Sequence, residues 1–144
     1  LGHAFHALSS NTKYGSFNMM NVEHDFIEVP SKMAENWAFE PEIIEKVSQH
    51  YQDPNKKMPK NLIESIIQIN KITNSISKID NIYKSLFDMK IHSIEEYDEN
   101  IDFLAMWNKE QKEMLGIGDI DNTKSVTTFA HIVNGYDAGY YGYL

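Results

Sequence analysis

A regular apolar stripe in the middle of the chain constrains the fold more than any other feature. Apolar side chains recur every three or four positions at Leu62, Ile66, Ile69, Ile72, Ile76, Ile79, Tyr83 and Leu86. This spacing matches the period of an α-helix, and the two-residue alternation typical of a strand is not sustained. It predicts one long amphipathic helix, or two helices end to end, with the apolar side against a core. A coiled coil is disfavoured because the flanking charges are irregular.

The remaining segments also favour helices. The spacing of their apolar residues predicts helices over 1–9, 26–39, 41–50 and 93–115. Pro30 is expected in the first turn of the second of these, where its missing N–H breaks no hydrogen bond. Trp37 and Trp107 are expected in the core, and turn-forming residues predict loops over 9–21, 52–59 and 116–125. The sequence therefore predicts an all-α fold with ordered loops.

Composition narrows the classes of function. The chain has 144 residues, 42% of them hydrophobic, which is enough apolar material for a core. A formal net charge of −8 argues against a nucleic-acid partner, because no group of residues could neutralise phosphates. No apolar run approaches the roughly 20 residues of a membrane span, so no membrane partner is expected. Since there is no cysteine, any metal must be held by histidine and carboxylate.

A histidine near the start of the chain and a distant glutamate form a candidate metal pair. A helix of the zincin type carries His-Glu-x-x-His, in which the two histidines lie one turn apart on one face. If Leu1 and Gly2 are the two x positions, His3 is the second histidine, and we expect the first histidine and the catalytic glutamate to precede Leu1. Glu28 can supply a third ligand, which leaves a fourth position for water. On spacing alone, however, such a pair more often has no metal role.

Two neighbours of this pair are candidates for supporting roles. His6 lies three positions after His3, and packing against a ligand or orienting it by a hydrogen bond is favoured over binding the metal. Asp25 can accept the N–H of a ligating imidazole, or it can cap the helix that follows. The sequence leaves both roles of Asp25 open.

Three segments together resemble one family. Residues 2–8 read Gly-His-Ala-Phe-His-Ala-Leu, residues 24–31 read His-Asp-Phe-Ile-Glu-Val-Pro-Ser, and residues 135–144 read Gly-Tyr-Asp-Ala-Gly-Tyr-Tyr-Gly-Tyr-Leu. In this order and spacing they resemble the thimet oligopeptidase family of zinc metallopeptidases, whose pattern is Phe-His-Glu-x-Gly-His-x-x-His followed by Phe-Val-Glu-x-Pro-Ser-Gln. The stretch 87–92 is similar to the family's Asp-x-x-x-His segment. The chain departs from the pattern at Lys32 and Ala34, and neither change involves a metal ligand. A Trp-Ser pair usually follows in the family, so we expect the natural chain to continue beyond Leu144.

The resemblance implies a zinc site and a second group of site residues. By resemblance, His3 and Glu28 hold one zinc ion. The resemblance also includes residues 129–131, Phe-Ala-His, just before the last segment. By resemblance, His131, Tyr136 and Tyr143 would bind the substrate and stabilise charge, with Tyr140, Gly135 and Gly139 as further substrate contacts. Phenol or imidazolium donors aimed at a developing oxyanion are worth on the order of 3 kcal/mol each, and glycines let a loop approach the substrate backbone. A packing role stays open for the tyrosines and is favoured for Tyr141.

The resemblance also implies the wider context. The chain would be a fragment of a large, mostly helical zincin-type peptidase domain, divided into a zinc-ligand region (1–39), a helical scaffold (40–115) and a Gly/Tyr-rich substrate loop (116–144). The complete domain would hydrolyse short peptides with a zinc-activated water, and the fragment would pair with the rest of that domain and be inactive alone. The cytoplasm is the expected compartment, with the mitochondrion as the alternative because mitochondrial intermediate peptidases share the ligand pattern. A non-catalytic helical module that binds a partner through its apolar stripe is the alternative of a different class.

Overall fold

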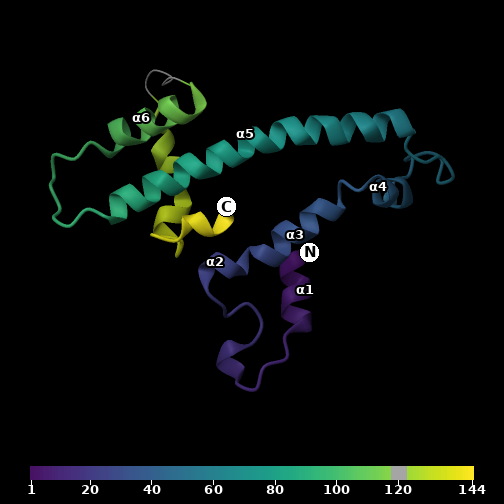
Figure 1. The fold of residues 1–144 in the computed structure, drawn as a ribbon, viewed down its shortest axis with the longest axis horizontal. Coiled ribbons are helices and arrows are strands. Elements are labelled where there is room, and N and C mark those ends of the chain that lie inside the picture. The colour runs from purple at the N-terminus through teal and green to yellow at the C-terminus, as the bar shows by residue number, and fades with distance from the viewer. Residues whose placement is uncertain (118–122) are drawn as a thin grey trace. The chain divides into compact units, whose positions relative to one another are not determined.

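The computed structural model of the chain describes residues 1–117 and 123–144 (Figure 1). Every regular element in these residues is helical, so the predicted all-α class is confirmed. The chain forms two compact units, Leu1–Ser75 and Ile76–Leu144. The helix α5, Lys60–His92, is continuous across the boundary between them.

The first unit begins with short helices, and two of them have a proline in the first turn. Its elements are α1 (Gly2–Ser9), the 3₁₀ turn η1 (Gly15–Phe17), α2 (His24–Ile27), α3 (Val29–Trp37) and α4 (Pro41–Val47). Pro30 lies in the first turn of α3 as predicted, because a proline there loses no hydrogen bond. The helix expected over 26–39 is divided at Glu28, which ends α2 and starts α3. The helix expected over 41–50 ends three residues early, at Val47.

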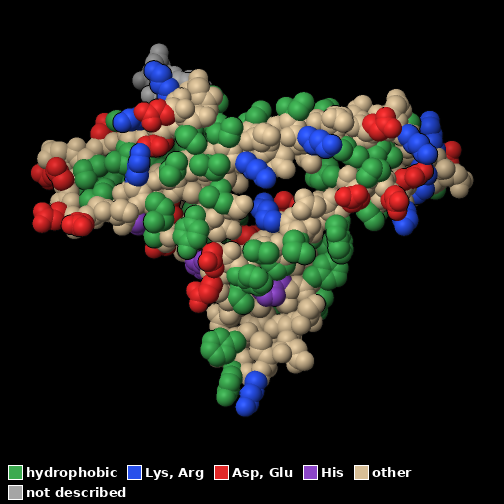
Figure 2. Space-filling view, viewed as in Figure 1, with side chains coloured by type: hydrophobic (Ala, Val, Ile, Leu, Met, Phe, Trp, Pro, Cys, Tyr) green, Lys and Arg blue, Asp and Glu red, His purple; other side chains and the backbone are tan. Residues whose placement is uncertain are grey.

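Helix α5, which is 33 residues long, confirms the long helix that the apolar stripe predicts. Tyr83 and Ile63 are buried, but the middle of the stripe is exposed. Ile69, Ile72 and Ile76 keep 58–68% of their surface accessible, and hydrophobic side chains are visible along α5 in Figure 2. The expectation that the whole stripe faces a core is therefore wrong for the described chain. Periodicity shows which side of a helix is apolar, but it does not show what covers that side.

The second unit adds one longer helix and three 3₁₀ turns to the end of α5. These elements are α6 (Phe103–Leu115), η2 (Ser125–Thr128), η3 (Ala130–Val133) and η4 (Tyr140–Tyr143). The helix expected over 93–115 is wrong in its first ten residues, because the Asp98 carboxylate accepts the backbone N–H of Asn100 in a turn. Helix α6 starts where Asp102 caps it, with Asp102 Oδ1 2.9 Å from the backbone nitrogen of Ala105. The loop expected over 116–125 falls partly outside the described residues.

The core of the second unit is a cluster of aromatic rings. Its buried members are Tyr83, Phe87, Trp107, Phe129 and Tyr140. Trp107 lies at the centre, with ring centroids 5.0 Å from Tyr83 and Phe87 and 5.5 Å from Phe129. The predicted burial of Trp107 is confirmed, whereas that of Trp37 is wrong, since 67% of its surface is exposed.

None of the helices in the described part of the chain is both long and apolar enough to cross a membrane.

Candidate functional site

The first unit brings His3 and Glu28 together although they lie far apart in the sequence. His3 is on α1, and Glu28 is at the junction of α2 and α3. Helix α1 packs against α3, and His3 Nε2 lies 3.3 Å from Glu28 Oε2. Glu28 is 7% exposed, and the Ser31 hydroxyl lies 3.0 Å from its Oε2, within donating distance. The residues that the sequence singled out as a metal pair thus face each other, and the Ser31 hydroxyl contacts the same carboxylate oxygen.

The distance between these two atoms fits shared coordination of a zinc ion. Zinc holds a histidine nitrogen and a carboxylate oxygen at about 2.0–2.1 Å in tetrahedral geometry, which places two such ligands about 3.4 Å apart. The same contact is an ion pair when the imidazole is protonated. Among the described residues, no group of three or more histidine, cysteine or carboxylate side chains could hold a metal ion. The described chain therefore assembles two ligands of a prospective site.

His6 and Asp25 differ in how closely they approach this pair. The ring of His6 packs edge-on against Phe26, with centroids 6.1 Å apart. Within the described chain, His6 Nδ1 and His3 Nδ1 are buried without a hydrogen-bond partner. Asp25 is exposed in the first turn of α2, and Glu23 occupies the N-cap position that the sequence had left open for Asp25. The supporting roles of His6 and Asp25 at a metal stay predictions.

Gly2 is a residue of this site to which the sequence analysis assigned no structural role. It is buried where α1 crosses α3. A Cβ on Gly2 would lie 2.2 Å from the Ser31 Cα and 2.6 Å from the Pro30 carbonyl oxygen, so only glycine permits this approach. The close crossing holds His3 against Glu28. The glycine before His3 in the family pattern was the available signal.

In the second unit, four predicted site residues form one cluster of rings. The His131 ring lies 5.6 Å from Tyr136, 5.1 Å from Tyr140 and 5.5 Å from Tyr143, measured between centroids. The tyrosines also contact one another, because Tyr143 is 5.1 Å from Tyr136 and 5.0 Å from Tyr140. We call His131, Tyr136, Tyr140 and Tyr143 the His–Tyr cluster. It places one imidazole and several phenols, all potential hydrogen-bond donors, on one side of the aromatic core.

Tyr140 is the buried member of the His–Tyr cluster. It is 6% exposed, its ring meets Phe129 at 4.7 Å, and its hydroxyl lies 3.3 Å from Asn81 Oδ1. Burial, together with the negative charge of Asp80, raises the pKa of Tyr140 above its usual value. His131, Tyr136 and Tyr143 are only partly buried, so their polar atoms have more access to solvent. Tyr140 therefore fits a buried position that supports the other rings of the His–Tyr cluster better than a solvent-exposed position.

The two glycines predicted as substrate contacts have different environments. Gly135 is exposed with a positive φ of 84°, and a Cβ there would meet nothing within 4 Å. Its φ favours glycine because other L-residues rarely adopt that conformation. Gly139 is buried immediately before η4. Substrate contact by Gly135, Gly139 and Tyr140 stays a prediction.

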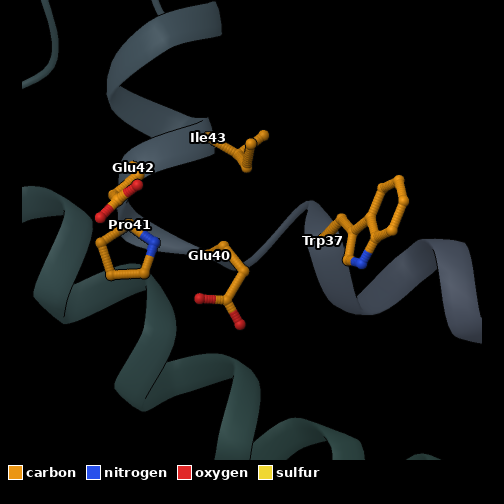
Figure 3. A pocket seen from close by; sticks show the side chains of 5 residues that line it. All are labelled: Trp37, Glu40, Pro41, Glu42 and Ile43. Atoms are coloured by element: carbon orange, nitrogen blue, oxygen red, sulfur yellow. The ribbon is translucent and has the colours of Figure 1, made fainter.

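A shallow surface pocket lies elsewhere in the first unit. Its lining residues, from the end of α3 to the start of α4, are Trp37, Glu40, Pro41, Glu42 and Ile43 (Figure 3). The picture shows the Glu42 and Glu40 carboxylates pointing away from the Trp37 ring. The side chains do not converge on a common point, so this pocket offers no catalytic arrangement.

Comparisons with known proteins find relatives along the whole chain. The family described as Peptidase family M3 matches residues 1–144. The chain is 33% identical to saccharolysin of Saccharomyces cerevisiae, over the whole chain and 20% of that protein. It is 32% identical to the thimet-like oligopeptidase of Dictyostelium discoideum, over 99% of the chain and 21% of that protein. It is 30% identical to mitochondrial intermediate peptidase 1 of Cryptococcus neoformans, over the whole chain and 18% of that protein. The chain thus spans about a fifth of the length of these curated relatives.

Proposed function

Since this chain belongs to peptidase family M3, we propose that it forms part of the catalytic domain of a zinc-dependent metallo-oligopeptidase. The observation that carries the proposal is the 3.3 Å approach of His3 Nε2 to Glu28 Oε2. This approach joins two segments that the family pattern names as ligand segments. The contact is supported by the close approach of α1 to α3 at the buried Gly2, which a chance contact between two exposed side chains would not require.

In this proposal His3 and Glu28 bind one zinc ion. Bound zinc lowers the pKa of a coordinated water and polarises a peptide carbonyl. His3 would bind through Nε2 and Glu28 through Oε2, with the Ser31 hydroxyl orienting the carboxylate. The buried Nδ1 of His3 would then need an acceptor. We propose that the rest of the catalytic domain supplies this acceptor, the remaining histidine ligand and the general base.

The His–Tyr cluster would bind the substrate and stabilise charge during peptide hydrolysis. When water attacks a peptide carbonyl, negative charge develops on the carbonyl oxygen. Hydrogen-bond donors held in place before the reaction stabilise that charge without reorganising. His131, Tyr136 and Tyr143 would act in this way, while Tyr140, Gly135 and Gly139 would shape the surface that meets the peptide.

The proposed substrates are short peptides, and the proposed location is the cytoplasm. The names of saccharolysin and the thimet-like oligopeptidase favour the oligopeptidase activity, and the name of the mitochondrial intermediate peptidase keeps the mitochondrion as the alternative. The 144-residue chain alone is expected to bind zinc weakly and to hydrolyse no peptide, because its described residues bring only two ligands together.

The first test removes the carboxylate from the natural protein that contains this chain. Glu28→Gln keeps the shape of the side chain but removes its charge, so bound zinc should fall by at least about tenfold and peptide hydrolysis should fall with it. Glu35→Gln is the matched control, because Glu35 lies on the same helix α3 and, among the described residues, forms an ion pair with the exposed Lys32. Zinc content is measured by mass spectrometry of the metal. Full zinc occupancy in the Glu28 variant would refute the assignment.

The second test removes single hydroxyl groups from the His–Tyr cluster. Tyr136→Phe and Tyr143→Phe should each lower kcat by about 10²-fold, as expected for the loss of one donor to an oxyanion. Tyr141→Phe is the control, because Tyr141 neighbours the cluster but takes no part in its ring contacts. Equal kcat values for all three variants would contradict a role of the cluster in charge stabilisation.

One observation favours a second candidate, a non-catalytic module that binds a partner. The exposed isoleucines of α5, Ile69, Ile72 and Ile76, form an apolar face that a partner helix could cover. Zinc content distinguishes the peptidase from the partner-binding module. The module is favoured if the natural protein purifies without zinc and takes up none when zinc is supplied.

A further inference from the structure

Asp88 on α5 is the most deeply buried carboxylate of the second unit. No part of its surface is accessible, although it lies on a helix among aromatic core residues. A buried carboxylate is unfavourable unless its oxygens accept hydrogen bonds. The similarity of residues 87–92 to a family segment assigns no role to Asp88, so this buried carboxylate needs a physical explanation.

The partners of Asp88 lie about fifty residues later in the chain. Its Oδ1 accepts the backbone N–H of Ala138 at 3.0 Å, and its Oδ2 accepts that of Tyr140 at 3.1 Å. The ring of His92, one turn further along α5, places Nδ1 2.9 Å from Asp88 Oδ1. Both oxygens of the carboxylate are therefore occupied, and two of the three contacts go to the backbone of one short loop.

That loop carries the three tyrosines of the His–Tyr cluster, whose rings contact His131 in η3. Tyr136 precedes the two anchored amides, Tyr140 contributes one of them, and Tyr143 follows in η4. Ala138 has a φ of 56°, in the left-handed region that residues other than glycine rarely adopt. Such a conformation persists only where the surroundings hold it, and the bond from Ala138 to Asp88 holds the strained residue itself.

Aspartate suits this position better than its neutral analogue. A carboxylate offers two acceptor oxygens, whereas asparagine has one oxygen and an NH₂ group that faces any second N–H as a like donor. With the backbone amides of Ala138 and Tyr140 bound to different oxygens of the carboxylate, Asp88 fixes the loop at two points. Two points define the direction of the loop as well as its distance from α5.

We propose that Asp88 is a positioning residue that anchors the loop at residues 138–140 and sets the placement of the His–Tyr cluster. The anchoring stands on the contacts of Asp88 alone, whereas its effect on catalysis rests on the proposed function. Asp88 touches the backbone of the loop and acts on the reaction only through Tyr136, Tyr143 and His131.

Amide hydrogen exchange in the natural protein tests the anchor without reference to activity. Asp88→Asn removes one acceptor and sets an NH₂ group against one of the two N–H groups, so at least one of the amides of Ala138 and Tyr140 should exchange at least about tenfold faster than in the wild type. Glu110→Gln is the matched control, because Glu110 is also a buried carboxylate of this unit but pairs with Lys90 and not with the loop. In the control, these two amides should keep their wild-type rates. Unchanged rates in the Asp88 variant, or equal acceleration in both variants, would overturn the anchor.

A measurement on the wild type decides the matter if Asp88→Asn does not fold. The Gly142 amide donates to the Gly139 carbonyl in the same loop and has no contact with Asp88 among the described hydrogen bonds. The amides of Ala138 and Tyr140 should exchange more slowly than that of Gly142, by about tenfold or more. Equal rates for all three amides would overturn the proposal.

Steady-state kinetics then tests the consequence for catalysis. A displaced His–Tyr cluster loses interactions made in the transition state, so Asp88→Asn should lower kcat by about 10- to 100-fold and change KM little. Glu110→Gln should change kcat less than twofold. Fast amide exchange with unchanged kcat would refute the catalytic part and keep the anchor. A wild-type protein without peptidase activity would refute the proposed function, and the exchange experiment would still decide the role of Asp88.

Discussion

The substitution Gly2→Ala gives the sharpest test of how the first unit holds His3 against Glu28. An alanine Cβ at position 2 would lie 2.2 Å from the Ser31 Cα, and ordinary van der Waals contact begins near 3.4 Å. Because the opposing atoms belong to the backbone, no side-chain rotation can relieve the clash. Helix α1 must therefore move away from α3 by about 1.2 Å, the difference between the two distances.

This movement has two measurable consequences. The 3.3 Å separation of His3 Nε2 and Glu28 Oε2 should widen by up to about 1 Å, whereas metal–ligand distances tolerate deviations of only about 0.2 Å. Zinc affinity should therefore fall by at least about tenfold, the lower end of what a misplaced supporting residue costs. Forcing an extra methyl group into a packed contact should also lower the free energy of unfolding by about 1–3 kcal/mol.

The assay compares Gly2→Ala with Gly15→Ala in the natural protein. A Cβ on Gly15 would meet nothing within 4 Å, so this variant makes the same chemical change without a clash. Zinc affinity is measured by competition with a chromophoric chelator, and stability by denaturant unfolding of the zinc-free protein. If Gly2→Ala keeps both zinc affinity and stability at the level of the control, the close crossing does not hold the ligand pair. If only stability falls, the crossing is structural and does not position the proposed zinc ligands.

Three further predictions concern pH, helix capping and metal removal. Burial, with smaller contributions from the charges of Asp80 and Tyr140, raises the pKa of Tyr83 to about 12. In the unfolded chain the phenol ionises near pH 10, so the folded state holds its proton more tightly and is stabilised below that pH. About 2–3 kcal/mol of stability should therefore be lost as the pH rises from 10 to 12. Tyr83→Phe should remove this loss, as unfolding curves of both proteins across that pH range would show; parallel curves would contradict the assignment. Replacing the N-cap of α6 by Asp102→Ala should lower the free energy of unfolding by about 1 kcal/mol, and an unchanged denaturant midpoint would argue against the cap. Removing zinc from the natural protein with a chelator should lower its thermal midpoint, because the metal binds the folded state only, and the Glu28→Gln variant should show no such shift.

The helical elements could be predicted where local signals decide them. The period of the apolar residues was enough for α5, and Pro30 and Pro41 mark the first turns of α3 and α4 because proline fits only there in a helix. The start of α6 was missed because Tyr97 and Ile101 continue a helical spacing. The turn at Asp98 and the cap at Asp102 end that pattern with side-chain hydrogen bonds, which apolar periodicity does not register.

The sequence named residues for the candidate site but not the residues that support them. His3 and Glu28 were identified by type and by resemblance, and the structure places them in contact. Gly2 and Asp88 were missed, because each acts on a segment that is distant in sequence: Gly2 admits the backbone of Ser31, and Asp88 accepts amides fifty residues away. Their roles exist only once the chain has folded, so neither composition nor spacing contains them.

The ring contacts of the second unit run without a break from Trp107 through Phe129 and Tyr140 to His131. A mutation that loosens the packing of the aromatic core should therefore also shift the proposed donors. A mutation that changes the donors should likewise alter the packing of the core. In natural variants, a substitution of one of these contacting rings should therefore be accompanied by compensating substitutions at the rings that it touches. Engineering for heat tolerance would meet the same coupling, since stiffening Trp107 or Phe129 also fixes the angle at which His131 is presented.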